Sequence, residues 1–376
     1  VIGSAGGAGA DTHLEWTWDI VREVAEKEEI GLRVALIHAE VQIDALKESV
    51  AAGIVAPLGP VPPLDDETLD RTIRVVGQMG AEPIISALDQ GANLVLAGRA
   101  CDAAIFAAPA IRHGSDPGLA WHMGELLECG AMAAQPGSAS DCLMGSIENG
   151  HFIIEPVSPE RSCTPLTIAA HSLYERSHPS RSVGPGHVLD VSNCRFEAVD
   201  ERRVMVSGSR YIEERPVHVK LEGAGRVGFR TMVIGGIRDP IALRRLDETL
   251  EAVETKTRKF FASNDGQPYS LRFVIYGRDG VMGAAEPTPE ITGHEVGLLL
   301  DVVGETQEIA DTICGYARAS LQHYYYEGIL ATGANIAFPV APSDIPCGPV
   351  YEFTVHHLVE VGDPLDMFPV EMRTIG

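Results

Sequence analysis

Three short apolar segments in the first hundred residues alternate with helical patterns, and this alternation constrains the fold most. The segments are 1–3, 32–37 and 93–97, and the middle one, LRVALI, forms a continuous apolar strand pattern. Such a run is typical of a strand covered on both faces, as in a parallel sheet flanked by helices. The pattern therefore predicts an N-terminal doubly wound parallel sheet, of Rossmann or flavodoxin type, over residues 1–136.

A helix is predicted directly after the first of these strands. Thr12 and Glu15 have the spacing of a capping box at the start of a helix. The apolar residues that follow recur at helical spacing, at Trp16, Ile20, Val21 and Val24.

From about residue 137 the pattern changes from alternating strands and helices to hairpins. Asn149-Gly150, a preferred turn pair, separates the strand-like segments 143–147 and 152–154. We therefore expect a second domain, residues 137–376, that is an α+β lobe with antiparallel strands. Its tail has the order strand, strand, helix and strand, which resembles half of a ferredoxin-like unit: 271–276, 295–302, 306–323 and 351–358.

Composition excludes several classes of partner. A formal charge of −24 opposes binding to nucleic acid or to an anionic membrane surface, both of which need Lys and Arg. No apolar run reaches the ~18–20 residues that span a bilayer, and we find no signal peptide. The seven cysteines form no CxxC pair, as expected for free thiols in a reducing compartment. We expect a cytoplasmic protein that binds a small molecule. Because the sequence starts at Val1 inside a strand-like segment, we also expect further residues to precede it.

A glycine-rich loop, from Gly3 to Gly9, joins the first strand to the helix. Glycines let backbone N–H groups approach an anion at a helix N-terminus, so Gly6, Gly7 and Asp11 are candidate substrate-binding residues. The loop has neither a Walker A sequence nor a G-x-G-x-x-G fingerprint, so no nucleotide cofactor is predicted. The alternative is a tight turn with Asp11 as a plain helix cap.

Polar residues follow each of the three strands. His38 comes directly after the second strand, and Arg99 and Asp102 follow the third. Because ligands bind at the carboxyl ends of parallel strands, we expect these residues and Asp11 to line one site. Arg99 is the candidate for binding a substrate carboxylate, and His38 and Asp102 are candidate catalytic residues. The alternatives are an Arg99–Asp102 ion pair that fixes the loop, an N-cap role for Asp102 and a structural role for His38.

Three further candidates lie elsewhere in the sequence. His122, in a predicted helix, is a candidate general base at a cleft between domains, with a buried and hydrogen-bonded histidine as the alternative. Ser138 lies in a small-residue loop, 136–142, which is either a linker or a substrate-contacting loop. Cys101 lies near a predicted helix start, where the pKa of a thiol falls, and is a candidate nucleophile.

No metal-binding motif is evident in the sequence. His356 and His357 are adjacent in a predicted strand and so point to opposite faces. His294-Glu295 is not followed by a second histidine four residues on, as a zinc-protease helix requires. We therefore predict no metal ligands, while the cofactor stays undetermined and a divalent metal or a CoA thioester substrate stays open.

Several long segments are specific enough to indicate a family. They include IGSAGGAGAD at 2–11, GANLVLAGRACD at 91–102, GLAWHMGELLECG at 118–130 and CTPLTIAAHSLYE at 163–175. These segments resemble the acyclic terpene utilisation AtuA-type family. The resemblance implies catabolism of a carboxylic acid or an acyl-CoA, in some cases beside a small ferredoxin-like partner protein. It also implies a longer, glycine-rich N-terminus lining the same site, and it carries over no catalytic residues.

With the predicted site of arginine and carboxylates, the resemblance favours a hydratase or dehydratase-type lyase. In this hypothesis Arg99 and the loop amides bind a substrate carboxylate, His122 or His38 moves a proton α to it, and Asp102 assists. The alternatives are a non-catalytic binding or scaffold subunit of a catabolic complex, and a CoA-dependent transferase or hydrolase. Because the predicted tail leaves strand edges around 351–358 uncovered, we also expect a homo-oligomer or a partner chain.

Overall fold

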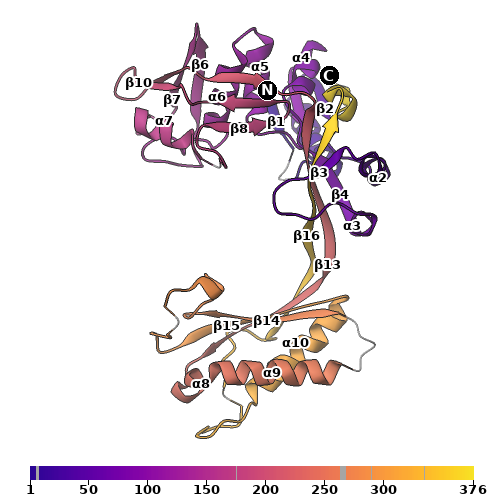
Figure 1. Ribbon diagram of the computed structural model, residues 1–376, viewed down its shortest axis with the longest axis vertical. Coiled ribbons are helices and arrows are strands. Elements are labelled where there is room, and N and C mark those ends of the chain that lie inside the picture. The colour runs from indigo at the N-terminus through magenta and orange to yellow at the C-terminus, as the bar shows by residue number, and fades with distance from the viewer. Residues whose placement is uncertain (6–7, 175, 263–267, 289, 334) are drawn as a thin grey trace. The chain divides into compact units, whose positions relative to one another are not determined.

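The computed structural model describes residues 1–376 except 6–7, 175, 263–267, 289 and 334. Contacts divide the chain into two compact units, unit 1 of residues 1–224 and 353–376 and unit 2 of residues 225–352. Two long strands belong in part to each unit, β13 (Val217–Ile237) and β16 (Asp344–Val361) (Figure 1). The sequence predicted a division near residue 136, whereas the contacts keep the segment after it in unit 1.

The N-terminal sheet of unit 1 has four strands in the order β1-β5-β2-β17. Strands β1 (Ile2–Ser4) and β2 (Leu32–Ile37) both pair in parallel with β5 (Leu94–Ala97). The fourth strand, β17 (Val370–Ile375), pairs antiparallel with β2. The protein is therefore a mixed α/β fold, and the predicted doubly wound Rossmann-like arrangement is not confirmed, because this sheet is small and mixed.

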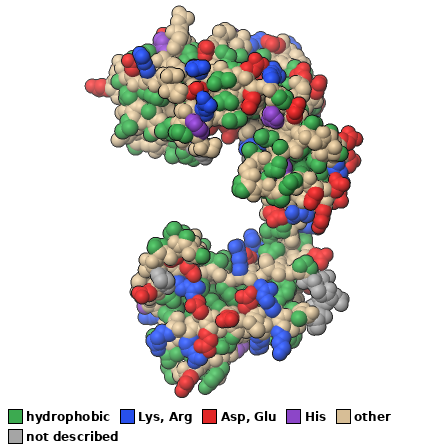
Figure 2. Space-filling view, in the orientation of Figure 1, with side chains coloured by type: hydrophobic (Ala, Val, Ile, Leu, Met, Phe, Trp, Pro, Cys, Tyr) green, Lys and Arg blue, Asp and Glu red, His purple; other side chains and the backbone are tan. Residues whose placement is uncertain are grey.

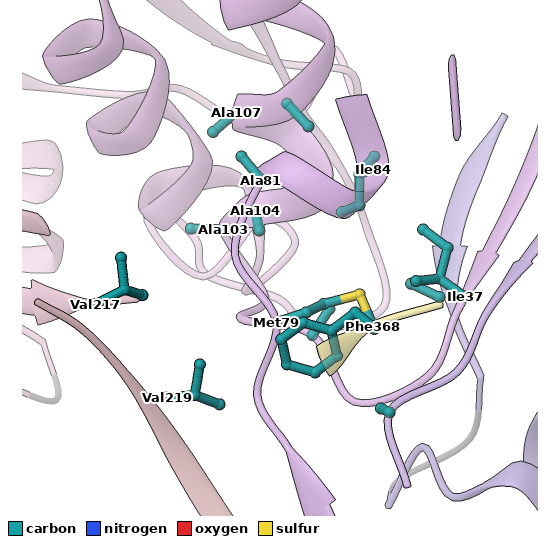
Figure 3. Close-up of a cluster of buried hydrophobic side chains, with 14 of the residues drawn as sticks. Ile37, Met79, Ala81, Ile84, Ala103, Ala104, Ala107, Val217, Val219 and Phe368 are labelled. Carbon is teal, nitrogen blue, oxygen red and sulfur yellow. The ribbon is translucent and has the colours of Figure 1, made fainter. Parts of the chain in front are cut away.

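Helices and short strands surround this sheet. One core cluster includes Ile37 of β2, Ile84, Met79, Phe368 and Val219, and Figure 3 shows part of it. The other elements in this part of the chain are α1 (Asp11–Lys27), α2 (Ile43–Ala51), β3 (Val55–Pro57), α3 (Asp66–Arg71), β4 (Thr72–Gly77), α4 (Glu82–Asp89), α5 (Ala104–Arg112), α6 (Pro117–Leu127) and α11 (Pro364–Met367).

Helix α1 forms where it was predicted, but its start differs from the prediction. It begins at Asp11 after Ala10, and no side chain caps it, so the predicted capping box of Thr12 and Glu15 is wrong. Its buried face differs from the stripe noted in the sequence, because Leu14 and Trp18 pack with the apolar side chains of β2 and β5, and Val21 of the predicted stripe packs beside them. The helix carries two apolar stripes, and the contact with the sheet decides which one is buried. The other stripe is exposed: Trp16, Ile20 and Val24.

The segment after residue 137 forms antiparallel hairpins, as predicted. One sheet has the order β10-β11-β7-β6, and a second has the order β12-β9-β8. Helix α6 contacts both α5 and strands of these sheets, which is why contacts assign the hairpins to unit 1. The elements are β6 (Leu143–Glu148), β7 (His151–Pro156), α7 (Pro165–His171), β8 (Arg181–Gly184), β9 (His187–Asp190), β10 (Arg195–Ala198), β11 (Val204–Ser207) and β12 (Arg210–Glu213).

Unit 2 has the element order β13-α9-β14-β15-α10-β16, the β-α-β-β-α-β order of ferredoxin-like units. Its strands follow the spatial order β14-β15-β13-β16, and apolar residues of α9 and α10 pack on one face of the sheet (Figure 1). The elements are α8 (Pro240–Arg244), α9 (Leu246–Phe261), β14 (Tyr269–Tyr276), a 3-10 turn (Gly283–Ala285), β15 (Val296–Gly304) and α10 (Gln307–Gln322).

The strand predicted to have an uncovered edge is covered only in part. Strand β16 has β13 on one side and β3 on the other, with His357 paired to Pro57 and Val359 to Val55. Strand β3 pairs only with residues 357–359, so it does not cover the edge at 351–356, where Tyr351 and Phe353 are exposed. Self-association therefore stays a prediction.

We predict that Gly9→Ala destabilises the protein more than Gly53→Ala does. Both glycines have positive φ, at 63° and 72°, where alanine costs about 1–2 kcal/mol. A Cβ at Gly9 would also lie 2.2 Å from the backbone nitrogen of Arg99, whereas a Cβ at Gly53 meets nothing within 4 Å. The clash should add about 1–3 kcal/mol to the loss in free energy of unfolding, measured with urea. Equal losses in the two variants would show that the loop is not packed against Arg99.

Candidate functional site

The three parallel strands bring the segments that follow them into direct contact. The loop after β1 touches the segment after β5, because a Cβ on Gly98 would lie 2.8 Å from both the Gly9 carbonyl oxygen and the Cβ of Ala39. Ala39 follows β2, so all three chain segments meet at the carboxyl edge of the sheet, as the sequence predicted. Gly6 and Gly7, two of the predicted substrate-binding residues, lie outside the described residues.

Asp11 and His38 form a hydrogen-bonded pair at this edge. Asp11 Oδ1 lies 3.0 Å from His38 Nδ1, and the backbone N–H of Asp11 donates to Glu40 Oε2 at 3.1 Å. An ionised carboxylate only accepts hydrogen bonds, and Asp11 is closer to the ring than Glu371, which lies 3.5 Å from Nε2. The neutral ring therefore favours the tautomer with a proton on Nδ1. The side chain of His38 is 23% exposed, so a small molecule can reach it. The side chain of Asp11 thus hydrogen-bonds His38 and does not cap helix α1.

A carboxylate that the sequence did not indicate faces the other ring nitrogen of His38. Glu371 Oε2, from β17, lies 3.5 Å from His38 Nε2. Arg373 hydrogen-bonds Glu371 and thereby lowers the pKa of that carboxyl, which keeps it ionised. Arg373 also bonds both carboxylate oxygens of Glu15 on α1. The pairing of β17 with β2, which are far apart in the sequence, brings Glu371 next to His38. No local sequence pattern predicts this pairing.

Arg99 has a different main partner from the one predicted. Its Nε donates to Glu222 Oε2 at 2.6 Å, and its Nη1 donates to the carbonyl of Ala100 at 2.8 Å, while Asp102 Oδ1 lies 3.5 Å away. Lys220 Nζ lies 2.8 Å from the other oxygen of Glu222. Burial raises the pKa of Glu222, but the hydrogen bonds from Arg99 and Lys220 outweigh it and lower the pKa overall. Two cations therefore share one carboxylate at this edge.

Asp102 and Cys101 do not have the local roles considered from sequence. Helix α5 begins at Ala104 with Ala103 as its N-cap, so Asp102 does not cap it, and its side chain is 60% exposed. Burial raises the pKa of the Cys101 thiol to about 12, with nearby carboxylates adding to the effect. A thiol with so high a pKa is not an activated nucleophile, so this burial argues against the nucleophile predicted at Cys101.

His122 lies in a buried position among the hairpins and not at the sheet edge. Its Nδ1 is 2.8 Å from Ser209 Oγ and its Nε2 is 2.9 Å from Ser172 Oγ, and the side chain has no exposed surface. Burial lowers its pKa to about 3. Both ring nitrogens are occupied, which matches the buried-histidine alternative and leaves neither nitrogen available to a substrate.

Ser138 makes its hydrogen bonds within its own loop region and not with residues of the sheet edge. Its hydroxyl accepts a hydrogen bond from the backbone of Ser140, and its own backbone N–H donates to the carbonyl of Ala131. The loop is held by Arg161, which donates to Asp141 at 2.7 Å. These contacts are internal to the loop region, and none joins Ser138 to the described edge residues.

The described residues include neither a membrane-spanning helix nor a metal-binding cluster. Within the described part of the chain, no helix is long and apolar enough to span a bilayer. No group of three or more His, Cys, Asp or Glu side chains among those same residues is placed to hold a metal ion.

We predict that His122 makes the protein less stable in mild acid. Between its folded pKa of about 3 and the ordinary value of 6.5, the unfolded chain binds a proton that the folded protein does not. The stabilisation is complete above pH 6.5 and falls by about 2 kcal/mol between pH 6.5 and about 5. Urea unfolding of His122→Gln should show a shallower loss over this range. A variant whose stability falls in parallel with the original protein would contradict the buried neutral state.

Comparison with known proteins identifies a family and nothing more specific. The family model described as acyclic terpene utilisation family protein AtuA matches residues 1–338. No curated protein and no solved structure matches the chain. The matched span contains the glycine-rich loop, His38, Arg99 and Glu222, while Glu371 lies after it. Because the match covers most of the sequence, the chain belongs to the acyclic terpene utilisation AtuA family.

Proposed function

We propose that this protein is a catabolic enzyme of the hydro-lyase type that acts on a carboxylic acid or an acyl-CoA thioester. The observation that supports this most is the Asp11–His38 pair at the carboxyl edge of the parallel strands. The hydrogen bond between Asp11 Oδ1 and His38 Nδ1 is 3.0 Å long, and the imidazole is partly exposed. Open α/β sheets bind ligands at this edge, and histidine is the side chain best suited to move protons near neutral pH.

The pair is arranged for removal of a proton next to a carbonyl or carboxylate carbon. With Asp11 holding the Nδ1 proton, His38 Nε2 accepts the proton from the α-carbon once the substrate displaces the exposed side chain of Glu371 from it. The imidazolium that forms lies between the carboxylates of Asp11 and Glu371, which stabilise its charge. In a syn elimination the same imidazolium then protonates the departing hydroxyl, so that water leaves and a double bond forms. Hydration is the reverse of these steps.

The cluster of Arg99, Lys220 and Glu222 is our proposed binding site for the anionic end of the substrate. Asp102, 3.5 Å from Arg99 and 60% exposed, is a second carboxylate beside the two cations that share Glu222. A substrate carboxylate would take the place of Asp102 beside Arg99, and Asp102 would then orient the substrate or assist the proton transfer. In a protein of net charge −24, two cations at one place are what an acidic substrate requires.

Two alternatives differ from this proposal in what they require. A CoA-dependent transferase or hydrolase acting through Cys101 is disfavoured by the raised pKa of that thiol. A non-catalytic scaffold would bind an acid at the edge without moving its α-proton. Cytoplasmic location, self-association and a small ferredoxin-like partner stay predictions, and light scattering of the purified protein addresses the second of these.

We predict that His38→Gln abolishes exchange of substrate α-protons with solvent. Proton NMR in D2O, with a panel of hydroxy acids and 3-hydroxyacyl-CoA thioesters, measures exchange even where the overall reaction lies far to one side. Loss of the general base should slow exchange at least about 100-fold. Asp11→Asn should slow it at least about 10-fold, because the imidazole loses the bond that fixes its tautomer.

The matched control is His113→Gln, since His113 follows α5 and is exposed. It should leave exchange unchanged. Exchange at the original rate in His38→Gln would contradict the proposed role of the pair. Tight binding of a panel member without exchange in the unmodified protein would favour the scaffold alternative.

A further inference from the structure

A second group of arginines lies in unit 2, in a pocket of about 620 Å³ on its sheet. Along β15, Leu300 and Val302 are buried beneath α9 and α10. Since side chains alternate along a strand, Asp301 between them faces the opposite side of the sheet. The pocket lies on that side, and Arg230 of β13 and Arg272 of β14 line it together with Asp301.

The two arginines share a single buried carboxylate. Arg230 Nε donates to Asp301 Oδ1 at 2.8 Å, and Arg272 Nε donates to Oδ2 at 2.7 Å, while Asp301 is only 3% exposed. One arginine would neutralise Asp301, so the three side chains together carry an excess positive charge. Each guanidinium has five N–H donors and uses one here, and no residue that the structure describes accepts a hydrogen bond from the remaining four.

The backbone beside this cluster is fixed by Gln307, the first residue of α10. Its side-chain amide donates to the carbonyl of Arg230 at 3.1 Å and to Thr231 Oγ1 at 2.7 Å. Its carbonyl oxygen accepts from the backbone N–H of Gly348 at 3.1 Å, on β16. The backbone at Arg230 is therefore fixed in position. The side chain of Arg272 is 63% exposed and available to a ligand. Such preorganisation lowers the entropy cost of binding.

The rest of the pocket wall is largely apolar, with Val227, Val303 and Val350 among its lining residues. Glu305 also lines it, but this residue is exposed and forms no ion pair with either arginine in the described part of the chain. In Figure 2, blue cationic and red acidic side chains are interspersed over the unit that is orange in Figure 1. What sets this pocket apart is that both of its arginines bond one buried carboxylate, Asp301, beside apolar surface.

We propose that this pocket binds an amphipathic small molecule through a carboxylate or phosphate group. The planar forks of Arg230 and Arg272 match both oxyanions, and the valine side chains take the hydrocarbon part of the ligand. The site is separate in its residues from the sheet edge of unit 1, so it stands whether or not the proposed hydro-lyase activity is found.

Isothermal titration of the full chain with hexanoate, hexyl phosphate and the neutral hexanamide tests this proposal. At least one of the two anions should bind, with hexanamide at least about 10-fold weaker, since a charge-assisted hydrogen bond contributes that much. The preferred anion tells a carboxylate ligand from a phosphate ligand. Arg272→Gln should weaken binding of that anion at least about 10-fold. The control Arg245→Gln, which removes an equal charge at the start of α9, should not.

Asp301→Asn keeps the test decisive if Arg272→Gln does not fold. Removing the shared carboxylate frees both guanidinium groups, so the anion should bind at least as tightly as before even though the unit is less stable. An unchanged affinity in Arg272→Gln, or equal binding of hexanoate, hexyl phosphate and hexanamide, would overturn the proposal. The cluster would then serve only to neutralise Asp301.

Discussion

The parallel pairing of β5 with β1 on one side and β2 on the other is the constraint on which the candidate site depends. It places the ends of three strands at one edge, so that residues far apart in sequence meet there. Glycine is required where the chain segments touch, because Gly9 and Gly98 leave no room for a Cβ. The close contact sets the positions from which Asp11, His38 and Arg99 reach the edge. Their hydrogen bonds then fix the side chains.

Unequal sharing of charge is the second theme of the structure. Glu222 is shared by Arg99 and Lys220, and Asp301 is shared by Arg230 and Arg272. Burying a carboxylate is costly unless it is paired, and one cation is enough to neutralise it. A second cation gives an anion from outside a group to pair with, in place of the exposed carboxylate nearby, Asp102 or Glu305. In a chain with 53 acidic and 29 basic residues, an acidic ligand would need such paired cations.

Much of the fold and of the edge could be predicted because the signals are local. Apolar runs mark the strands. His38, Arg99 and Asp11 are polar residues that follow these runs, so their position at the sheet edge could be predicted. Glu371 and Glu222 were missed because they lie on strands that pair with segments far away in the sequence. No local residue spacing predicts such pairing. Burial was the other gap. Spacing alone did not decide which stripe of α1 is covered, or whether His122 is exposed to a ligand or enclosed by Ser172 and Ser209.

The most direct measurement of the central claim is the tautomer of His38 in the free protein. Long-range proton–nitrogen NMR correlations of the imidazole, assigned with His38→Gln, report which ring nitrogen carries the proton at a pH where the ring is neutral. The account predicts a proton on Nδ1, held by Asp11, with Nε2 unprotonated, and loss of this preference in Asp11→Asn. A proton on Nε2 in both proteins would mean that Asp11 does not orient the ring, and His38 could not be the base proposed.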